Sequence, residues 1–141
     1  MFLAILNSMS MVISNYSLSY SPSYLPDKRV LLQVGSLDEV WIQRVEQIIL
    51  KNLVNSQFKN NSLADAVHCS ERQLYRQLNE LTGYTPHQFI REIRLHLARV
   101  YLENHRYRTV KEVSYAVGFK DTVHFSRLFI QRFGVYPASF L

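Results

Sequence analysis

The sequence predicts an all-α protein in which two similar helical units are joined by one longer helix. Helix starts recur from residue 36 onward, each a Ser or Thr followed three residues later by Glu or Gln, which is the capping-box spacing. Between these starts, apolar residues repeat with the 3.6-residue period of a helix, and no stretch keeps the alternation typical of a strand. A pattern around residue 83 also recurs about fifty residues later, which predicts the duplication.

Six helix starts are expected, and four of them are capping boxes. The boxes pair Ser36 with Glu39, Ser70 with Gln73, Thr85 with Gln88 and Thr109 with Glu112. Ser62 and Asp121 are predicted as single caps of two further helices, because each carries a side-chain oxygen that can accept from the first turn.

The first helix is expected from about Asp38 to Asn55. Its apolar stripe, predicted to face the core, consists of Val40, Trp41, Val45, Ile48, Ile49 and Leu53. A short helix over residues 62–67 and a third helix over residues 71–82 follow. Gly83 then ends the third helix in the left-handed conformation that favours glycine.

The fourth helix, over residues 86–104, is expected to be the longest. It begins with Pro86, which suits the first helical position because its missing N–H has no partner there. The predicted inward residues are Phe89, Ile90, Ile93, Leu97, Val100 and Tyr101. At 1.5 Å per residue the helix would be about 28 Å long. Two more helices, over residues 110–117 and 122–133, complete the predicted fold.

The internal repeat defines two units of short helix, turn and longer helix. At an offset of 51 residues, it matches Gly83 with Gly134, Pro86 with Pro137, Phe89 with Phe140 and Arg76 with Arg127. Upstream of the turn, the offset is 50 and matches Leu63 with Val113, Ala66 with Ala116 and Val67 with Val117. The second turn is therefore expected to be one residue longer than the first.

Composition and charge limit the classes of partner that this domain is expected to bind. The 141 residues are 48% hydrophobic, which suits one compact domain. The net charge of +5 lies entirely in residues 56–141, which favours a polyanionic partner, with a merely solvated basic face as the alternative. The single cysteine, Cys69, excludes an internal disulfide and a CxxC site, and a reducing, cytoplasmic location is expected.

Residues 1–36 are predicted to be a poorly ordered leader without an assigned function. Residues 1–26 carry no charge, and Ser and Asn interrupt the apolar start well before the roughly 20 residues of a membrane span. A secretory signal would have a positive n-region, whereas the first basic residue is Lys28.

The two helical units can be either plain αα-hairpins or DNA-reading helix-turn-helix units. In a reader, the second helix is anchored by apolar residues at i, i+4 spacing and projects polar groups outward. Leu74 with Leu78, and Phe125 with Phe129, have that spacing, and Arg, Gln, Thr, Ser and His surround them. Arg can donate two hydrogen bonds to guanine and Gln can pair with adenine, which favours the reader.

These features resemble the C-terminal DNA-binding domain of the arabinose-regulator (AraC/XylS) family of bacterial transcription factors. The resemblance covers about residues 38–141 and rests on the segments 70–76, 89–95, 117–121, 125–129 and 134–137. Residues 81–83 and 89–91 are most similar to output domains of two-component and hybrid two-component regulators. Most relatives carry a receiver or ligand-binding domain before this region, so we expect either a stand-alone member or a fragment of a larger regulator. The last helix of the family is normally longer, so the final helix of this chain is expected to be a stub.

The resemblance implies seven helices in two helix-turn-helix subdomains, which the long helix holds against one side of the DNA. The domain is expected over residues 37–141, with a first unit at about 62–82, a linker helix at about 86–104 and a second unit at about 110–133. Carried over by position, the base-reading candidates are Arg72, Tyr75, Arg76, Thr122, Val123, His124, Ser126 and Arg127. A helix of about 28 Å suits adjacent major grooves, which repeat every 34 Å or so.

Five other basic residues are candidates for phosphate contacts, with solvated surface charge as the alternative: Arg91, Arg94, Lys111, Lys120 and Arg132. No metal site or cofactor is expected, since no His or Cys pair has ligand spacing. We expect double-stranded DNA and RNA polymerase as partners, no membrane, a monomeric isolated domain and no catalysis. The alternative function is a helical module that binds protein within a larger regulator.

Overall fold

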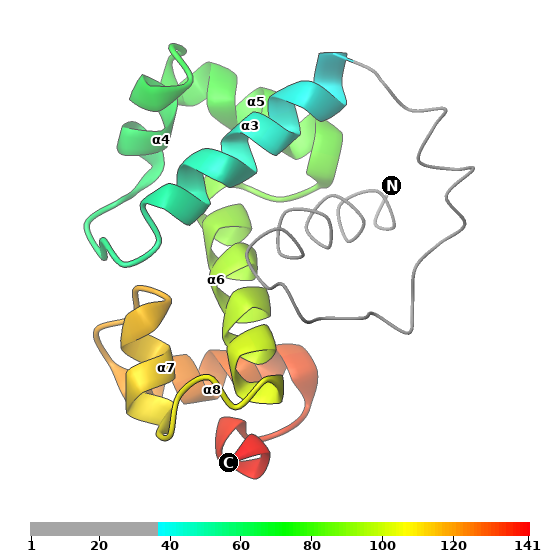
Figure 1. Ribbon diagram of the computed structural model, residues 1–141. Helices are drawn as coiled ribbons and strands as arrows, with labels where there is room; N and C mark the ends of the chain where they lie inside the picture. Colours follow the sequence, from blue (N-terminus) through cyan, green and yellow to red (C-terminus); the bar gives the residue numbers. More distant parts are fainter. Residues whose placement is uncertain (1–36) are drawn as a thin grey trace.

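The computed structural model describes residues 37–141, which form two lobes at the two ends of one long helix (Figure 1). The elements in chain order are α3 (Leu37–Lys51), α4 (Asn60–Ala66), α5 (Glu71–Thr82), α6 (Pro86–Glu103), α7 (Val110–Ala116), α8 (Thr122–Phe133) and the 3-10 helix η1 (Pro137–Phe140). We call α3, α4 and α5 the first lobe, and α7, α8 and η1 the second lobe. The all-α prediction is confirmed for this part of the chain. The predicted leader and the Ser36 cap lie outside the described residues.

Side-chain caps fix the starts of four helices, as the sequence predicts. Ser70, Thr85 and Thr109 each accept a hydrogen bond from the backbone N–H three residues on, at 3.1, 3.2 and 3.1 Å. Asp121 accepts from two backbone N–H groups at the start of α8. The Ser62 cap is wrong: α4 begins two residues earlier, at Asn60, and its cap residue Lys59 makes no side-chain cap bond.

The two units end alike, which confirms the repeat. Gly83 and Gly134 close α5 and α8 in the left-handed region, at φ values of 77° and 72°, and each donates its N–H to the carbonyl four residues back. The turns inside the units also correspond. His68 has a φ of 58° in the first turn, and Gly118 has a φ of 89° in the second.

Each lobe has its own apolar centre. Leu63, Leu74 and Leu78 are fully buried in the first lobe, and Val113, Phe125 and Phe129 are fully buried in the second. In the second lobe, a chain of aromatic rings continues from Phe129 to Phe133 and Phe140. Because η1 supplies Phe140, even this short terminal helix contributes to the core.

Helix α6 is buried on two sides because it packs against both lobes. It contacts α3 and α5 of the first lobe, and α7 and η1 of the second. The predicted inward face was therefore incomplete, since Leu95, Ala98 and Leu102 are also buried. Val100 and Tyr101, which we predicted inward, are only partly buried.

Helix α3 differs from its prediction in length and register. It ends at Lys51 rather than near Asn55, and the Asn52 side chain donates to the Ile48 carbonyl just beyond that end. Val40 is 61% exposed, whereas Ile42 is buried. The first turn of α3 thus lies beyond the edge of the core, so the apolar pattern alone misplaces this stripe.

Candidate nucleic-acid interface

Helix α5 presents three of the predicted base-reading side chains to solvent. Arg72, Tyr75 and Arg76 are all exposed, and Tyr75 has 52% of its surface accessible. None of these three side chains has a hydrogen-bond or ion-pair partner within residues 37–141. Leu74 and Leu78, between and behind them, are fully buried and hold the helix against α4. The polar groups of α5 are thus available to a partner.

Helix α8 presents an equivalent but less uniform surface. Val123, His124 and Arg127 are exposed, whereas Thr122 and Ser126 are partly buried. The Thr122 hydroxyl lies 3.1 Å from the buried Ser114 hydroxyl, which itself donates to the Lys111 carbonyl. Thr122 therefore donates to Ser114 and keeps acceptor capacity for an outside donor.

The matched arginines occupy the same register in the two helices. Arg76 is the sixth residue of α5, and Arg127 is the sixth residue of α8. Both are exposed, and both follow a capped first turn that fixes the helix start. Two guanidinium groups in equivalent places on separate helices are suited to two equivalent readings of one long partner.

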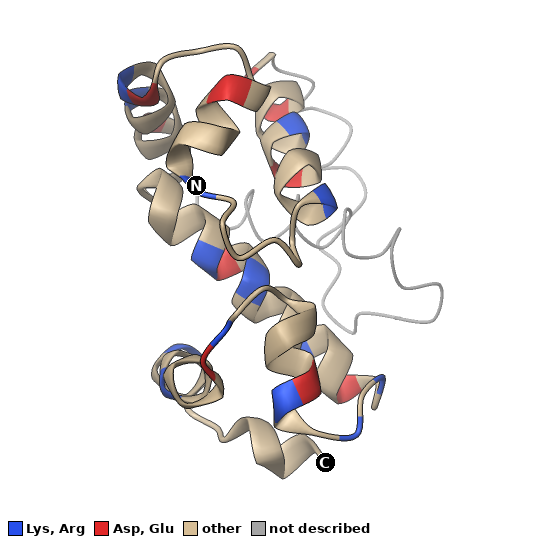
Figure 2. Cartoon of the chain, turned by 90° about the vertical axis from the view of Figure 1, so that its left-hand side faces the viewer, with Lys and Arg blue, Asp and Glu red and all other residues tan. Residues whose placement is uncertain are grey.

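The predicted phosphate contacts separate into two groups. Lys111 and Lys120 are exposed, with the Lys111 ammonium 5.7 Å from the centre of the Tyr115 ring, and Arg91 is partly buried. Figure 2 shows Lys and Arg positions on both lobes and along the helix between them. Arg94 and Arg132 instead have partners within the protein, which gives them structural roles.

Arg94 joins the two lobes. Its guanidinium donates to the Asn55 carbonyl of the first lobe at 3.2 Å and to the Gly118 carbonyl of the second lobe at 3.3 Å. Burial lowers the pKa of this guanidinium below its ordinary value. A Cβ at Gly118 would overlap the Leu53 carbonyl oxygen, so the second turn touches the first lobe at its backbone. The lobes are thus held by a direct contact as well as by α6.

Arg132 holds α8 against α6. Its Nε lies 2.8 Å from the Glu92 carboxylate, its terminal nitrogen lies 3.3 Å from His96, and its guanidinium stacks over Phe133. Burial alone would raise the pKa of the Glu92 carboxyl, but the hydrogen bonds from His96 and Arg132 outweigh burial and hold it below its ordinary value. This carboxylate therefore stabilises the folded state through its charged form.

We expect the Glu92 contact to make folding sensitive to acid. A carboxyl whose pKa is lowered by folding adds stability above its unfolded pKa, and this contribution is lost as the pH falls through the folded value. Wild-type protein should lose thermal stability as the pH falls below about 4.5, and the Glu92→Gln variant should lose less over the same window. Melting curves from pH 7 to pH 3 measure this. Parallel losses in both proteins would contradict the role of Glu92.

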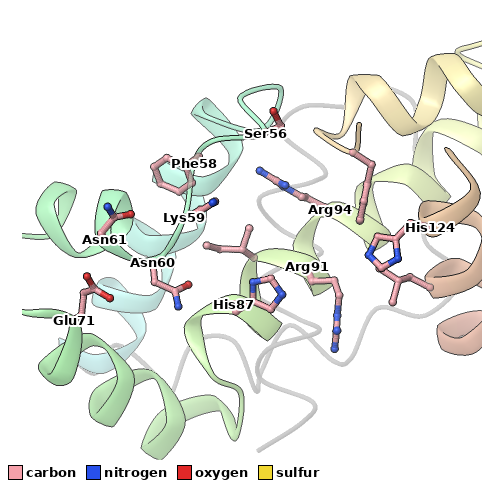
Figure 3. A pocket seen from close by; sticks show the side chains of 13 residues that line it. Ser56, Phe58, Lys59, Asn60, Asn61, Glu71, His87, Arg91, Arg94 and His124 are labelled. Carbon is pink, nitrogen blue, oxygen red and sulfur yellow. The ribbon is translucent and has the colours of Figure 1, made fainter. Parts of the chain in front are cut away.

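A cleft of about 720 Å³ lies between the two lobes, beside their direct contact, and has α6 as its floor. Its charged and polar lining comprises residues from the first lobe, from α6 and from α8: Ser56, Lys59, Asn60, Asn61, Glu71, His87, Arg91, Arg94 and His124. Figure 3 shows the first-lobe residues on one side of this space and His124 on the other. Sequence reasoning missed Lys59 and His87, because only the packing of the lobes brings them together with Arg91.

Three further features of the described residues concern metal binding, membrane spans and the reactivity of Cys69. No cluster of His, Cys, Asp and Glu suited to a metal ion occurs over residues 37–141. No helix in that range combines the length and apolar character needed to span a bilayer. Burial raises the pKa of the Cys69 thiol, which reduces the thiolate fraction that a nucleophile requires.

Curated relatives that match this chain in sequence include a histidine kinase and a transcriptional activator. Histidine kinase P4 of Formosa agariphila is 30% identical over 109 residues, which is 77% of this chain and 8% of the kinase. The HTH-type transcriptional activator RhaS of Escherichia coli is 39% identical over 77 residues, which is 55% of this chain and 27% of the activator. The chain therefore spans only a small part of the length of either relative.

Solved structures match the fold. A transcriptional regulator of Chromobacterium violaceum, described by its AraC-type DNA-binding domain, has a TM-score of 0.64 and 25% identity, over 69% of this chain and 85% of that chain. The DNA-binding domain of AdpA, solved in complex with a target DNA, has a TM-score of 0.62 and 30% identity, over 68% of this chain and 85% of that chain.

A family model described as a helix-turn-helix domain matches residues 63–141, which contain the second unit of the repeat and all but the first residues of the first unit. The resemblance drawn from the sequence is thereby confirmed, including the all-α fold that it implied. The duplicated units, their capped second helices and these likenesses lead to one assignment: the chain belongs to the AraC-type family of helix-turn-helix DNA-binding transcription regulators.

Proposed function

We propose that residues 37–141 form a sequence-specific DNA-binding domain that places α5 and α8 in adjacent major grooves of one duplex. The observation that carries this proposal is the matched register of Arg76 and Arg127 on two exposed helices held by one continuous helix. Helix α6 has 18 residues and is about 27 Å long, close to the roughly 34 Å repeat of the major groove. One chain thus carries two readers, so the isolated domain acts as a monomer.

We divide the candidate residues into base contacts and phosphate contacts. We assign base contacts to Arg72, Tyr75 and Arg76 on α5 and to Thr122, Val123, His124, Ser126 and Arg127 on α8. Val123 can make only apolar contact, for example with a thymine methyl group. We assign phosphate contacts to Arg91, Lys111 and Lys120, and we leave out Arg94 and Arg132 because their guanidinium groups are held by protein partners.

The proposed domain consists of a first reading unit at residues 60–82, a linker helix at residues 86–103 and a second reading unit at residues 110–133. Its action is regulation of transcription in the cytoplasm by binding, without catalysis. RNA polymerase as a protein partner stays a prediction. The likeness to a segment of a histidine kinase supports the subgroup that residues 81–91 indicate, the output domains of two-component regulators.

Selection of bound duplexes from a randomised pool tests this function. We expect two enriched half-sites whose centres lie about one helical turn apart, because α5 and α8 read neighbouring major grooves. Binding to the selected duplex should also fall steeply with salt, since phosphate contacts release counterions. A pool that shows no enrichment, together with weak and sequence-blind binding, would favour a module that binds protein instead.

The matched arginines should carry base specificity. Arg76→Ala and Arg127→Ala are each expected to cost about 1–3 kcal/mol of binding free energy on the selected duplex and much less on random DNA. Fluorescence anisotropy titrations on both duplexes measure the difference. Arg44→Ala is the matched control, because Arg44 is an exposed arginine of α3 with no assigned contact. Equal losses on both duplexes would reduce Arg76 and Arg127 to phosphate contacts.

A further inference from the structure

The cleft between the lobes has a basic lining. Lys59, Arg91 and Arg94 line it with His87 and His124, whereas Glu71 is its single acidic lining residue. Arg94 is held by two backbone carbonyls. Within residues 37–141, no carboxylate lies within ion-pair distance of Lys59 or Arg91. Figure 3 shows Lys59 on the first-lobe side of the cleft and Arg91 on its α6 floor. The cleft thus has unpaired positive charge.

The cleft also lies between the starts of the two proposed reading helices. Glu71 is the first residue of α5, His124 is the third residue of α8, and both line the cleft. A duplex that lies across the starts of both helices would therefore pass over the cleft. Where two adjacent major grooves face a protein, the stretch between them presents the minor groove, which the phosphates of both strands border.

We propose that this cleft binds the sugar-phosphate backbone of the DNA between the two half-sites, with Lys59 and Arg91 as its phosphate-binding side chains. The inference rests on the proposed function and adds a contact region that neither reading helix supplies. Arg91 offers a planar set of donors that matches a phosphate, and Lys59 offers a point charge from the opposite side. The amide of Asn60 lies in the same lining and can donate to a phosphate oxygen.

The proposal predicts a specific coupling between these side chains and the central phosphates. In duplexes with the selected sequence, neutral methylphosphonate linkages replace the phosphates between the half-sites, one position at a time. At the contacted positions, wild-type affinity should fall roughly tenfold, as expected for the loss of a charge-assisted hydrogen bond. The Lys59→Gln, Arg91→Gln double variant should lose little further affinity from the same replacements, and its salt slope should be lower by about two.

Matched controls separate this role from general weakening. Methylphosphonates outside the two half-sites should affect the wild type and the double variant equally. Arg44→Gln removes an exposed arginine that does not line the cleft, and it should leave the effect of the central replacements unchanged. Circular dichroism melts should show that the double variant is folded, because neither Lys59 nor Arg91 forms an ion pair with a carboxylate of residues 37–141.

The outcomes distinguish this proposal from the proposed function. If the selected duplex binds specifically but central methylphosphonates lower the affinity of both proteins equally, or of neither, the cleft does not hold the backbone. The two-reader function then stands without it. If no sequence is selected at all, the proposed function fails, and the cleft proposal fails with it.

Discussion

Replacing Gly118 with alanine is expected to destabilise the protein by roughly 3 kcal/mol or more. Gly118 has a φ of 89°, where an L side chain is strained, and its Cβ would overlap the backbone carbonyl oxygen of Leu53. The Arg94 guanidinium lies 3.1 Å from the same Cβ position, so the alanine methyl group would be crowded by Arg94 as well as by Leu53. Denaturant unfolding curves of the wild type and the variant measure the loss.

The strain at φ is the smaller part of this effect. His68 occupies the corresponding turn of the first unit at a φ of 58°, so a residue with a Cβ is tolerated in that conformation. Gly83 and Gly134 supply the matched controls, because each has a positive φ but no atom within 4 Å of a Cβ. Gly83→Ala should cost only about 1–2 kcal/mol, from the left-handed conformation alone. Similar losses for Gly83→Ala and Gly118→Ala would show that the lobes do not meet at Gly118.

The helix boundaries followed from local chemistry and were therefore predictable. A capping box is a contact across three residues, and a left-handed glycine ends its own helix, so Ser70 and Gly83 indicate the limits of α5 directly. The repeat added a second, independent check, because Gly134 closes α8 in the same way. At the start of α4, the cap residue Lys59 makes no side-chain hydrogen bond, and Ser62 displaced the predicted boundary by two residues.

The contacts between lobes were not predictable from the sequence. Arg94 and Gly118 are 24 residues apart, and Glu92 and Arg132 are 40 apart, with no local pattern that marks either pair. As isolated basic residues, Arg94 and Arg132 resemble phosphate-binding residues, and only packing shows their internal partners. The cleft between the lobes could not be predicted from the sequence for the same reason. Lys59 follows the first helix and Arg91 lies in the fourth, and the fold alone gives them one shared space.

The hydrogen bonds of Arg94 to the Asn55 and Gly118 carbonyls are expected to limit the half-site spacings that both reading helices can bind together. Arg94→Met removes both carbonyl contacts while α6 stays continuous, so the lobes should gain small relative motion without separating. We expect the variant to bind each half-site alone as the wild type does, and to tolerate a one-base-pair change of spacing better. If the spacing tolerance of the variant equals that of the wild type, α6 and the backbone contact at Gly118 determine the lobe geometry without Arg94.

Inserting about 5 base pairs between the half-sites should abolish simultaneous binding by both readers. The insertion turns the second half-site to the opposite face of the duplex. The contacts at Arg94 and Gly118 hold the two lobes in one orientation, so the second lobe cannot rotate to follow it. Binding should then fall to the level of one half-site, a loss of roughly 10²- to 10⁴-fold, because the second contact no longer benefits from a high effective concentration. Anisotropy titrations against a duplex with a single half-site provide the reference.

An insertion of about 10 base pairs distinguishes rigid from flexible coupling. It restores the face of the DNA but moves the half-sites about 34 Å further apart, whereas α6 is only about 27 Å long. Helix α6 has no internal glycine or proline after its first residue, so it cannot extend to bridge the added length. A rigid monomer therefore loses as much affinity with 10 added base pairs as with 5. Near-full affinity after the longer insertion would mean that two chains each supply one reader, or that the lobes separate on DNA, and the fixed two-reader arrangement would be wrong.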